Sequence, residues 1–176
     1  MLEAIHLKPS IANSLPQITR EQIELWKRTY CKGATDDELA LFVSICKRTG
    51  LMPEARQIYA VKRLDRNVAH EVMSIMTSIE GQRAIAERTG EYRGQTPVYY
   101  TSGVKNASGD YIWIEGWCES QPPKMAKVGV HRAGFTNPVW GYASLASFQQ
   151  VNKENRPVGQ CAKMPDVMLA KCAESA

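Results

Sequence analysis

The stretch TDDELALFVSICKRTGLMPEARQIYAVKRL, residues 35–64, changes from a helical period to a strand period, and this change decides the fold class. Its first part repeats apolar residues at the spacing of one helix face. Thr35 and Glu38 form a capping box before this run, and Gly50 follows a basic last turn. From Arg56 onward apolar and polar residues alternate, which predicts a strand.

Towards the N-terminus the same helical signals occur once more. Thr19 and Gln22 form a second capping box, and Gly33 supplies a stop signal, so we expect a helix across residues 19–33. Residues 1–18 are expected to be an N-terminal arm. They lack the apolar core of a secretory signal.

Towards the C-terminus the chain becomes rich in predicted strands. Residues 68–77 alternate again, so residues 56–77 form a predicted antiparallel hairpin across the turn DRN. A third helix should begin at Ser78 and end at Gly90, and a last one should begin at Pro165. Between them we expect a polar loop at 149–160, preceded by four short strands at 96–103, 110–120, 125–135 and 137–148. This order predicts an α+β fold, with small antiparallel sheets or hairpins packed with about four to five helices.

Composition excludes several classes of protein. The 176 residues carry a net charge of +4, and no stretch approaches the roughly 18 apolar residues of a membrane span. The five cysteines are odd in number and widely spaced, without any C-x-x-C pair. Reduced thiols in a cytoplasmic protein are therefore expected, with no metal site.

Catalytic and nucleotide-binding motifs are absent. The chain has no G-x-x-x-x-G-K-[ST] and no G-x-G-x-x-G, so no ATP or other cofactor is expected. Asp36 and Asp37, with the distant Asp110, could serve a metal-dependent nuclease, but the start of a helix already explains the first two. These absences favour a protein that binds over one that makes or breaks bonds.

Basic and aromatic residues allow two interpretations. The cations either form an ordinary solvated surface or line a groove that binds the phosphates of a nucleic acid. A protein that binds a single strand also needs flat side chains on which the bases can stack. Tyr111, Trp113 and Trp117 are spaced to share one face of a strand, with Ile112 and Ile114 on the opposite face. These aromatic residues either stack on bases or finish the edge of a core.

Four blocks of the sequence together resemble the RecT/Bet family of phage single-strand annealing proteins, in order and in approximate spacing. They cover most of residues 19–176, which the resemblance identifies as a DNA-binding and oligomerisation core. The blocks are CKGATDDELALFVSICKRTGLMPEARQIYAVK, SIEGQRAIAERTGEYRGQ, PPKMAKVGVHRAGFTNPVWGYA and KMPDVMLAKCAESA.

The resemblance implies ATP-independent annealing of complementary single strands in a bacterial host cell. Members of the family assemble as rings or helical filaments and hold single-stranded DNA and the annealed duplex in a basic groove. A smaller C-terminal domain usually follows and contacts a partner exonuclease and the host single-strand-binding protein, so we expect this chain to be a trimmed form that lacks it. The resemblance does not decide whether Mg²⁺ assists.

The resemblance also implies which residues touch DNA. Four cations match basic positions of the family: Lys32, Arg56, Arg132 and Lys171. Lys127 and Lys163 are candidates by location only. Cys161 stands where many relatives have a Trp, and Asp166 and Val167 replace basic residues of a well-known relative. An oligomeric adaptor that does not anneal remains the main alternative to this interpretation.

Overall fold

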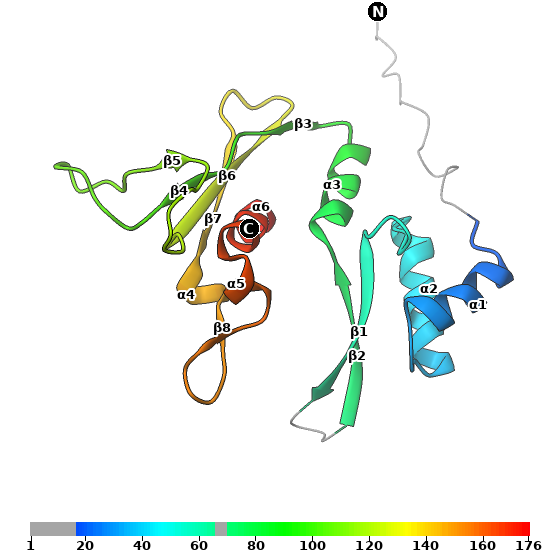
Figure 1. Cartoon of the computed structure of the whole chain (residues 1–176). Helices are drawn as coiled ribbons and strands as arrows, with labels where there is room; N and C mark the ends of the chain where they lie inside the picture. Colours follow the sequence, from blue (N-terminus) through cyan, green and yellow to red (C-terminus); the bar gives the residue numbers. More distant parts are fainter. Residues whose placement is uncertain (1–16, 66–69) are drawn as a thin grey trace, which may run out of the picture. The chain divides into compact units, whose positions relative to one another are not determined.

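The computed structural model describes residues 17–65 and 70–176. It divides into two compact units with the boundary between Ala84 and Ile85 (Figure 1). Most of the arm expected at residues 1–18, and the hairpin turn expected near residue 66, lie outside the described residues.

The first unit begins with two capped helices. Helix α1 spans Arg20–Thr29 and helix α2 spans Asp36–Thr49, and both predicted capping boxes are present. Gly50 ends α2 in the left-handed region at φ 64°, which a glycine adopts without steric cost. Helix α1 ends earlier than predicted, since its last residue is Thr29 and the predicted stop was Gly33.

A two-stranded hairpin completes this unit (Figure 1). Strand β1, Ile58–Asp65, pairs antiparallel with β2, His70–Thr77, as the alternation predicted. The core between the hairpin and the helices contains Trp26, Phe42 and Ile58, all at most 1% exposed. Leu41, an apolar residue of α2, is 56% exposed and lies outside this core.

Helix α3, Ile79–Arg88, follows the hairpin directly. The Ser78 hydroxyl accepts a hydrogen bond from the Gly81 amide at 3.0 Å, so the predicted helix start is confirmed. A Cβ at Gly81 would lie 2.2 Å from the Gln57 carbonyl oxygen. Glycine at this position therefore lets the helix approach the chain that precedes β1.

The second unit is built on a five-stranded antiparallel sheet. Strand β6, Met125–Arg132, is central: β4, Tyr99–Thr101, and β3, Tyr92–Gln95, pair with its two halves. Strand β7, Val139–Ser144, pairs along its other edge, and β6 and β7 lie within the strands predicted at 125–135 and 137–148. Strand β5, Ile114–Glu115, extends the sheet beyond β4.

Helix α6, Pro165–Ser175, lies against one face of this sheet (Figure 1). Its Leu169 and Ala173 are 1% exposed and pack on Tyr100, Val128 and other residues of the strands. A Cβ at Gly141 would lie 2.1 Å from the Ala173 carbonyl oxygen, so only glycine permits this approach of helix and strand. We call this side of the sheet the helix face and the opposite side the outer face.

The remaining elements link the sheet to α6. They include β8, Gln150–Val151, and β9, Pro157–Val158, which pair where a plain polar loop was expected. Asn152 organises the turn between them, because its side-chain oxygen accepts bonds from two backbone amides. Two short helices complete the connection, α4 at Leu145–Phe148 and α5 at Gln160–Lys163.

The predicted α+β class with small antiparallel sheets is confirmed. The strand predicted at 110–120 is wrong in extent, because only Ile114–Glu115 joins the sheet, while Tyr111 makes an isolated bridge with Lys105. Ile112 and Ile114 are 47% and 41% exposed, so the side of this segment opposite Tyr111 and Trp113 is not buried. Strand β3 was not predicted. Within the described residues, no helix has the length and apolar character needed to cross a bilayer.

Candidate nucleic-acid interface

The first unit carries two of the predicted DNA contacts, Lys32 and Arg56, and both side chains are exposed. Lys32 follows α1, between buried Cys31 and Gly33. Arg56 precedes β1 and has φ 57°, a conformation that is uncommon for a residue with a side chain. No described contact joins the two cations.

The backbone around Arg56 is fixed from both sides. Its amide donates to the Pro53 carbonyl at 3.0 Å, and its carbonyl accepts from the Ser78 hydroxyl at 2.7 Å. These bonds hold the residue in the left-handed conformation despite the steric cost. The direction in which the Arg56 side chain leaves the backbone is therefore fixed.

Two other cations of the first unit, Lys27 and Lys62, are paired with carboxylates. Lys27 Nζ lies 2.6 Å from Asp36 Oδ1, and this contact holds the pKa of Asp36 below its ordinary value. Lys62 Nζ lies 3.2 Å from Glu38 Oε2. The backbone bond from Thr35 lowers the pKa of Glu38 most, and Lys62 adds to the effect. Asp36 is thus held by an ion pair at the start of a helix.

The carboxylates do not gather as a nuclease would need. Across residues 17–65 and 70–176, no group of three or more His, Cys, Asp or Glu side chains is placed to hold a metal ion. All five cysteines are free. Burial raises the pKa of Cys31 to about 11 and that of Cys46 to about 12, so both remain thiols at neutral pH.

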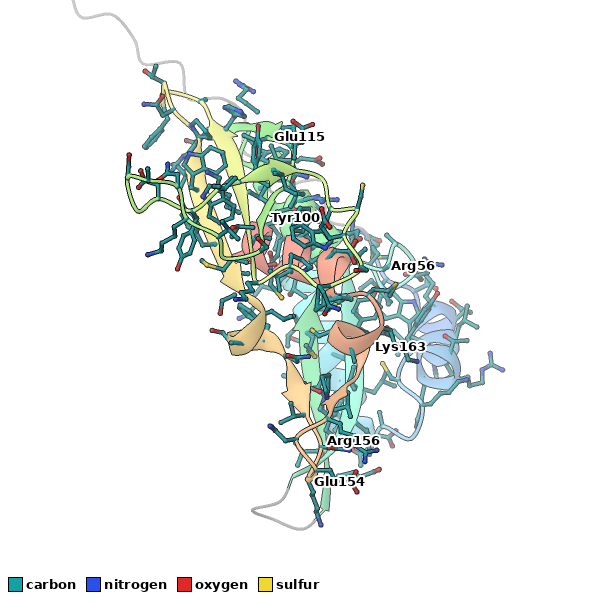
Figure 2. The ribbon with its side chains drawn as sticks, turned by 60° about the vertical axis from the view of Figure 1, so that its left-hand side comes forward. Arg56, Tyr100, Glu115, Glu154, Arg156 and Lys163 are labelled. Atoms are coloured by element: carbon teal, nitrogen blue, oxygen red, sulfur yellow. The ribbon has the colours of Figure 1, made fainter. Side chains whose placement is uncertain are left out.

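Three of the candidate cations lie on the helix-face side of the second unit. Lys171 is exposed on α6, whose opposite side packs on the sheet. Lys163 is exposed on α5, which contacts α6 (Figure 2). Arg132 ends β6, and its Nη2 and Nε lie 2.5 Å and 2.7 Å from Glu91 Oε2. Glu91 thus compensates part of the charge on Arg132.

Lys127 lies on the outer face instead. It is five residues before Arg132 on β6, and side chains an odd number apart point to opposite sides of a strand. Register places Tyr99 of β4 and Tyr142 of β7 directly opposite Lys127, on the same side. The sequence does not show that Lys127 lies on a different side of the sheet from Arg132, Lys163 and Lys171, because it does not show which face α6 covers.

Aromatic rings surround this lysine. Lys127 Nζ lies 5.6 Å from the ring centroid of Tyr99, 4.7 Å from that of Trp113 and 4.8 Å from that of Trp140. These distances are within the range of cation–π attraction. Ring contacts continue from Trp113 to Tyr142 at 6.1 Å and to Tyr111 at 6.3 Å.

The three aromatic residues expected on one strand face separate in the structure. Tyr111 and Trp113 lie together, but Trp117 does not join them. Its indole N–H donates to the Gln121 carbonyl at 2.9 Å, and its ring packs 6.1 Å from that of buried Tyr100. Gly116, at φ 72°, turns the chain before Trp117, so alternation does not continue to that residue.

Sequence reasoning missed three residues of the outer face, namely Tyr99, Trp140 and Tyr142. A signal was present for two of them, because Trp140 and Tyr142 are spaced by two on a strand that was correctly predicted. Tyr99 had no comparable signal. Its place beside Lys127 depends on the pairing of β4 with β6, which are not consecutive strands.

The exposed cations and rings suit a protein that binds a polyanion with flat groups. In comparison with models of known families, residues 16–176 match the RecT family, and the chain belongs to that family. Comparison with curated proteins gives no match. RecT-family proteins anneal single strands in DNA recombination. They are not enzymes that make or break bonds, and they use no ATP.

Proposed function

We propose that this protein anneals complementary single strands as a homo-oligomer, a ring or a helical filament, with DNA held along a basic groove that passes from subunit to subunit. The RecT-family match over residues 16–176 carries the proposal. Exposed cations in both units support it, because a groove that follows a sugar–phosphate chain needs positive charge at several places. We assign these contacts to Lys32, Arg56, Arg132, Lys163 and Lys171.

Contact with phosphates suits annealing because it ignores sequence. Cations neutralise both backbones, which otherwise repel each other, while the base edges stay free to test pairing. Lys171 is the best placed of the candidates, since Leu169 and Ala173 fix α6 on the sheet and leave this side chain outside. Arg132 must share its charge between Glu91 and a phosphate.

Partners and metal dependence complete the proposal. We assign contacts with an exonuclease and a host single-strand-binding protein to a smaller C-terminal domain of the kind that relatives carry, and to none of the residues described. Annealing itself should proceed without a metal bound by the protein, while Mg²⁺ could act on the DNA backbones. Annealing that persists in EDTA would show that no bound metal is required, and loss of annealing in EDTA would contradict this.

Charge reversal in α6 tests the proposal. Lys171→Glu should weaken binding to single-stranded DNA and slow annealing. The slope of log K against log salt should become shallower by roughly 0.7 for each phosphate that the variant no longer neutralises. Lys47→Glu is the matched control, because Lys47 is an exposed lysine on α2 outside the candidate set. Annealing by Lys171→Glu at the rate of the unchanged protein would contradict the assignment.

A further inference from the structure

We infer that the outer face of the second unit is a separate site that takes the bases of single-stranded nucleic acid. The inference rests on the proposed function for the identity of the ligand, and it adds a second surface to the phosphate groove. Its residues are Tyr99, Tyr111, Trp113, Lys127, Trp140 and Tyr142, which we call the aromatic face.

The sheet places these residues side by side. Tyr99, Lys127 and Tyr142 stand opposite one another on three neighbouring strands, so they form a row across the sheet. Trp140 is opposite Gly129, one step further along the same side. A Cβ at Gly129 would lie 2.9 Å from the Pro138 side chain, so glycine at this position makes room for Pro138. The rigid strands therefore set the spacing of the rings.

Three side chains of the aromatic face are exposed, while Tyr99 and Trp113 are half-buried. Tyr142 is 50% exposed, Tyr111 39% and Trp140 37%, although each presents a large apolar surface. The fold does not need them as core, because Tyr100, Ala126 and Val128 on the opposite side already pack beneath α6. Contiguous exposed aromatic surface of this kind is typical of a binding site.

The charge on the aromatic face favours nucleic acid over an apolar partner. Lys127 is held by rings and, among the described residues, lies within ion-pair distance of no carboxylate. Lys105 adds a second cation, 5.0 Å from the ring centroid of Tyr111. Glu115 stands beyond Tyr99 at the edge of the row, so a phosphate chain would run on the Lys127 side.

A nucleotide matches this pattern because it combines an anion with a flat ring. Every base has a flat face, so stacking on Trp140 or Tyr142 requires no particular sequence, as annealing demands. Duplex bases are already stacked on each other and cannot use the rings. The ligand is therefore a single strand whose bases lie on the rings and whose phosphates meet Lys127 and Lys105.

The aromatic face is distinct from the proposed phosphate contacts. Lys171, Lys163 and Arg132 belong to the opposite side of the same sheet, where α6 lies. A strand held at Lys171 by its phosphates does not reach the rings through the sheet. The two sides can thus hold different strands, or two stretches of one strand.

A pair of probes separates bases from phosphates: an oligothymidylate and an abasic oligonucleotide of equal length. The unchanged protein should bind the oligothymidylate more tightly. Trp140→Leu should weaken that binding roughly 5- to 100-fold, from the usual contribution of base–aromatic stacking, and leave binding of the abasic probe unchanged. Trp140→Phe keeps a flat ring and should recover most of the affinity. Phe148→Leu is the matched control, since Phe148 is 44% exposed on α4, outside the aromatic face.

Different results would contradict the base site and the proposed annealing function. If Trp140→Leu binds both probes like the unchanged protein, the base site is wrong while annealing through the groove stands. If it weakens both probes equally and also lowers the oligomer mass, the aromatic face is a subunit contact and the inference fails. If the unchanged protein anneals nothing, the proposed function fails first. Tyr142→Leu repeats the test at a more exposed ring should Trp140→Leu not fold.

Discussion

Two neighbouring tyrosines of β4 show how differently the two sides of one sheet are used. Tyr100 is 7% exposed beneath α6, and its hydroxyl lies 3.3 Å from the Asp166 carbonyl, to which it donates. Tyr99 points to the outer face, beside the ammonium of Lys127. Alternation along the strands thus assigns one set of residues to stability and leaves the other free to bind. Substitutions on the helix face should therefore lower stability, and substitutions on the outer face should instead weaken binding to a single strand.

The largest loss of stability is expected on the helix face, at Leu169. Leu169→Ala removes a side chain that is 1% exposed and leaves a cavity between α6 and the sheet. The free energy of unfolding should fall by about 2–5 kcal/mol. Denaturant titration measures this loss, and Val167→Ala, at a 42% exposed site of the same helix, should change stability far less. Equal losses for the two variants would contradict the packing of α6.

A smaller loss is expected where α6 approaches β7. Gly141→Ala places a methyl group against the Ala173 carbonyl, and the helix must shift to accommodate it. The free energy of unfolding should fall by about 1–3 kcal/mol, the usual cost of overpacking. Tyr142→Ala alters the next residue on the outer face and should weaken single-strand binding more than stability. A loss of stability in Tyr142→Ala together with a loss of binding in Gly141→Ala would contradict the roles assigned to the two sides.

The stability of the protein at alkaline pH tests the burial of Tyr100 on the helix face. Burial, with a smaller effect of the Asp166 carboxylate, raises the pKa of Tyr100. An acid whose pKa is raised by folding stabilises the protein while it is protonated. Its contribution is therefore complete below the unfolded pKa, near 10, and is lost as pH rises through the folded value. Tyr100→Phe should remove this part of the alkaline destabilisation. An unchanged alkaline slope in urea titrations would show that Tyr100 is not buried.

The smallest effect is expected at the exposed pair of Glu91 and Arg132. Glu91→Gln removes the carboxylate that holds the guanidinium, and an exposed ion pair contributes only about 0–1 kcal/mol to stability. Arg132 then becomes fully available for a phosphate, so affinity for the abasic oligonucleotide should rise a few-fold. Weaker binding by this variant would mean that Glu91 positions Arg132 for DNA instead of competing for it.

The fold was predictable where local chemistry decides it. Thr19 and Thr35 cap the first two helices as their capping boxes predicted, and Gly50 ends α2. The strand prediction for the segment around Trp113 was wrong in extent, because alternation alone does not show whether a partner strand is present. Pairing with β4 is limited there to Ile114–Glu115, and Gly109 and Gly116 turn the chain at positive φ on either side.

The candidate site was predictable only in part, because it is assembled by non-local pairing. Lys171 could be placed on the outside of a helix from periodicity alone. By contrast, Lys127 meets Tyr99 and Trp140 only because β6 pairs with both β4 and β7. Sequence spacing gives the residues that share a side of one strand, but it does not give which strands are neighbours or which side a later helix covers.

On the proposed division of the sheet, the aromatic face receives bases while the helix face holds the unit together. Photo-crosslinking of the unchanged protein to a single strand carrying a halogenated uracil tests it most directly, with adducts located by mass spectrometry. We predict adducts on Tyr99, Trp113, Trp140 or Tyr142. Tyr30 and Tyr59 are the internal comparison, because they are similarly exposed in the first unit. Adducts confined to those two tyrosines, with none on the aromatic face, would contradict the account.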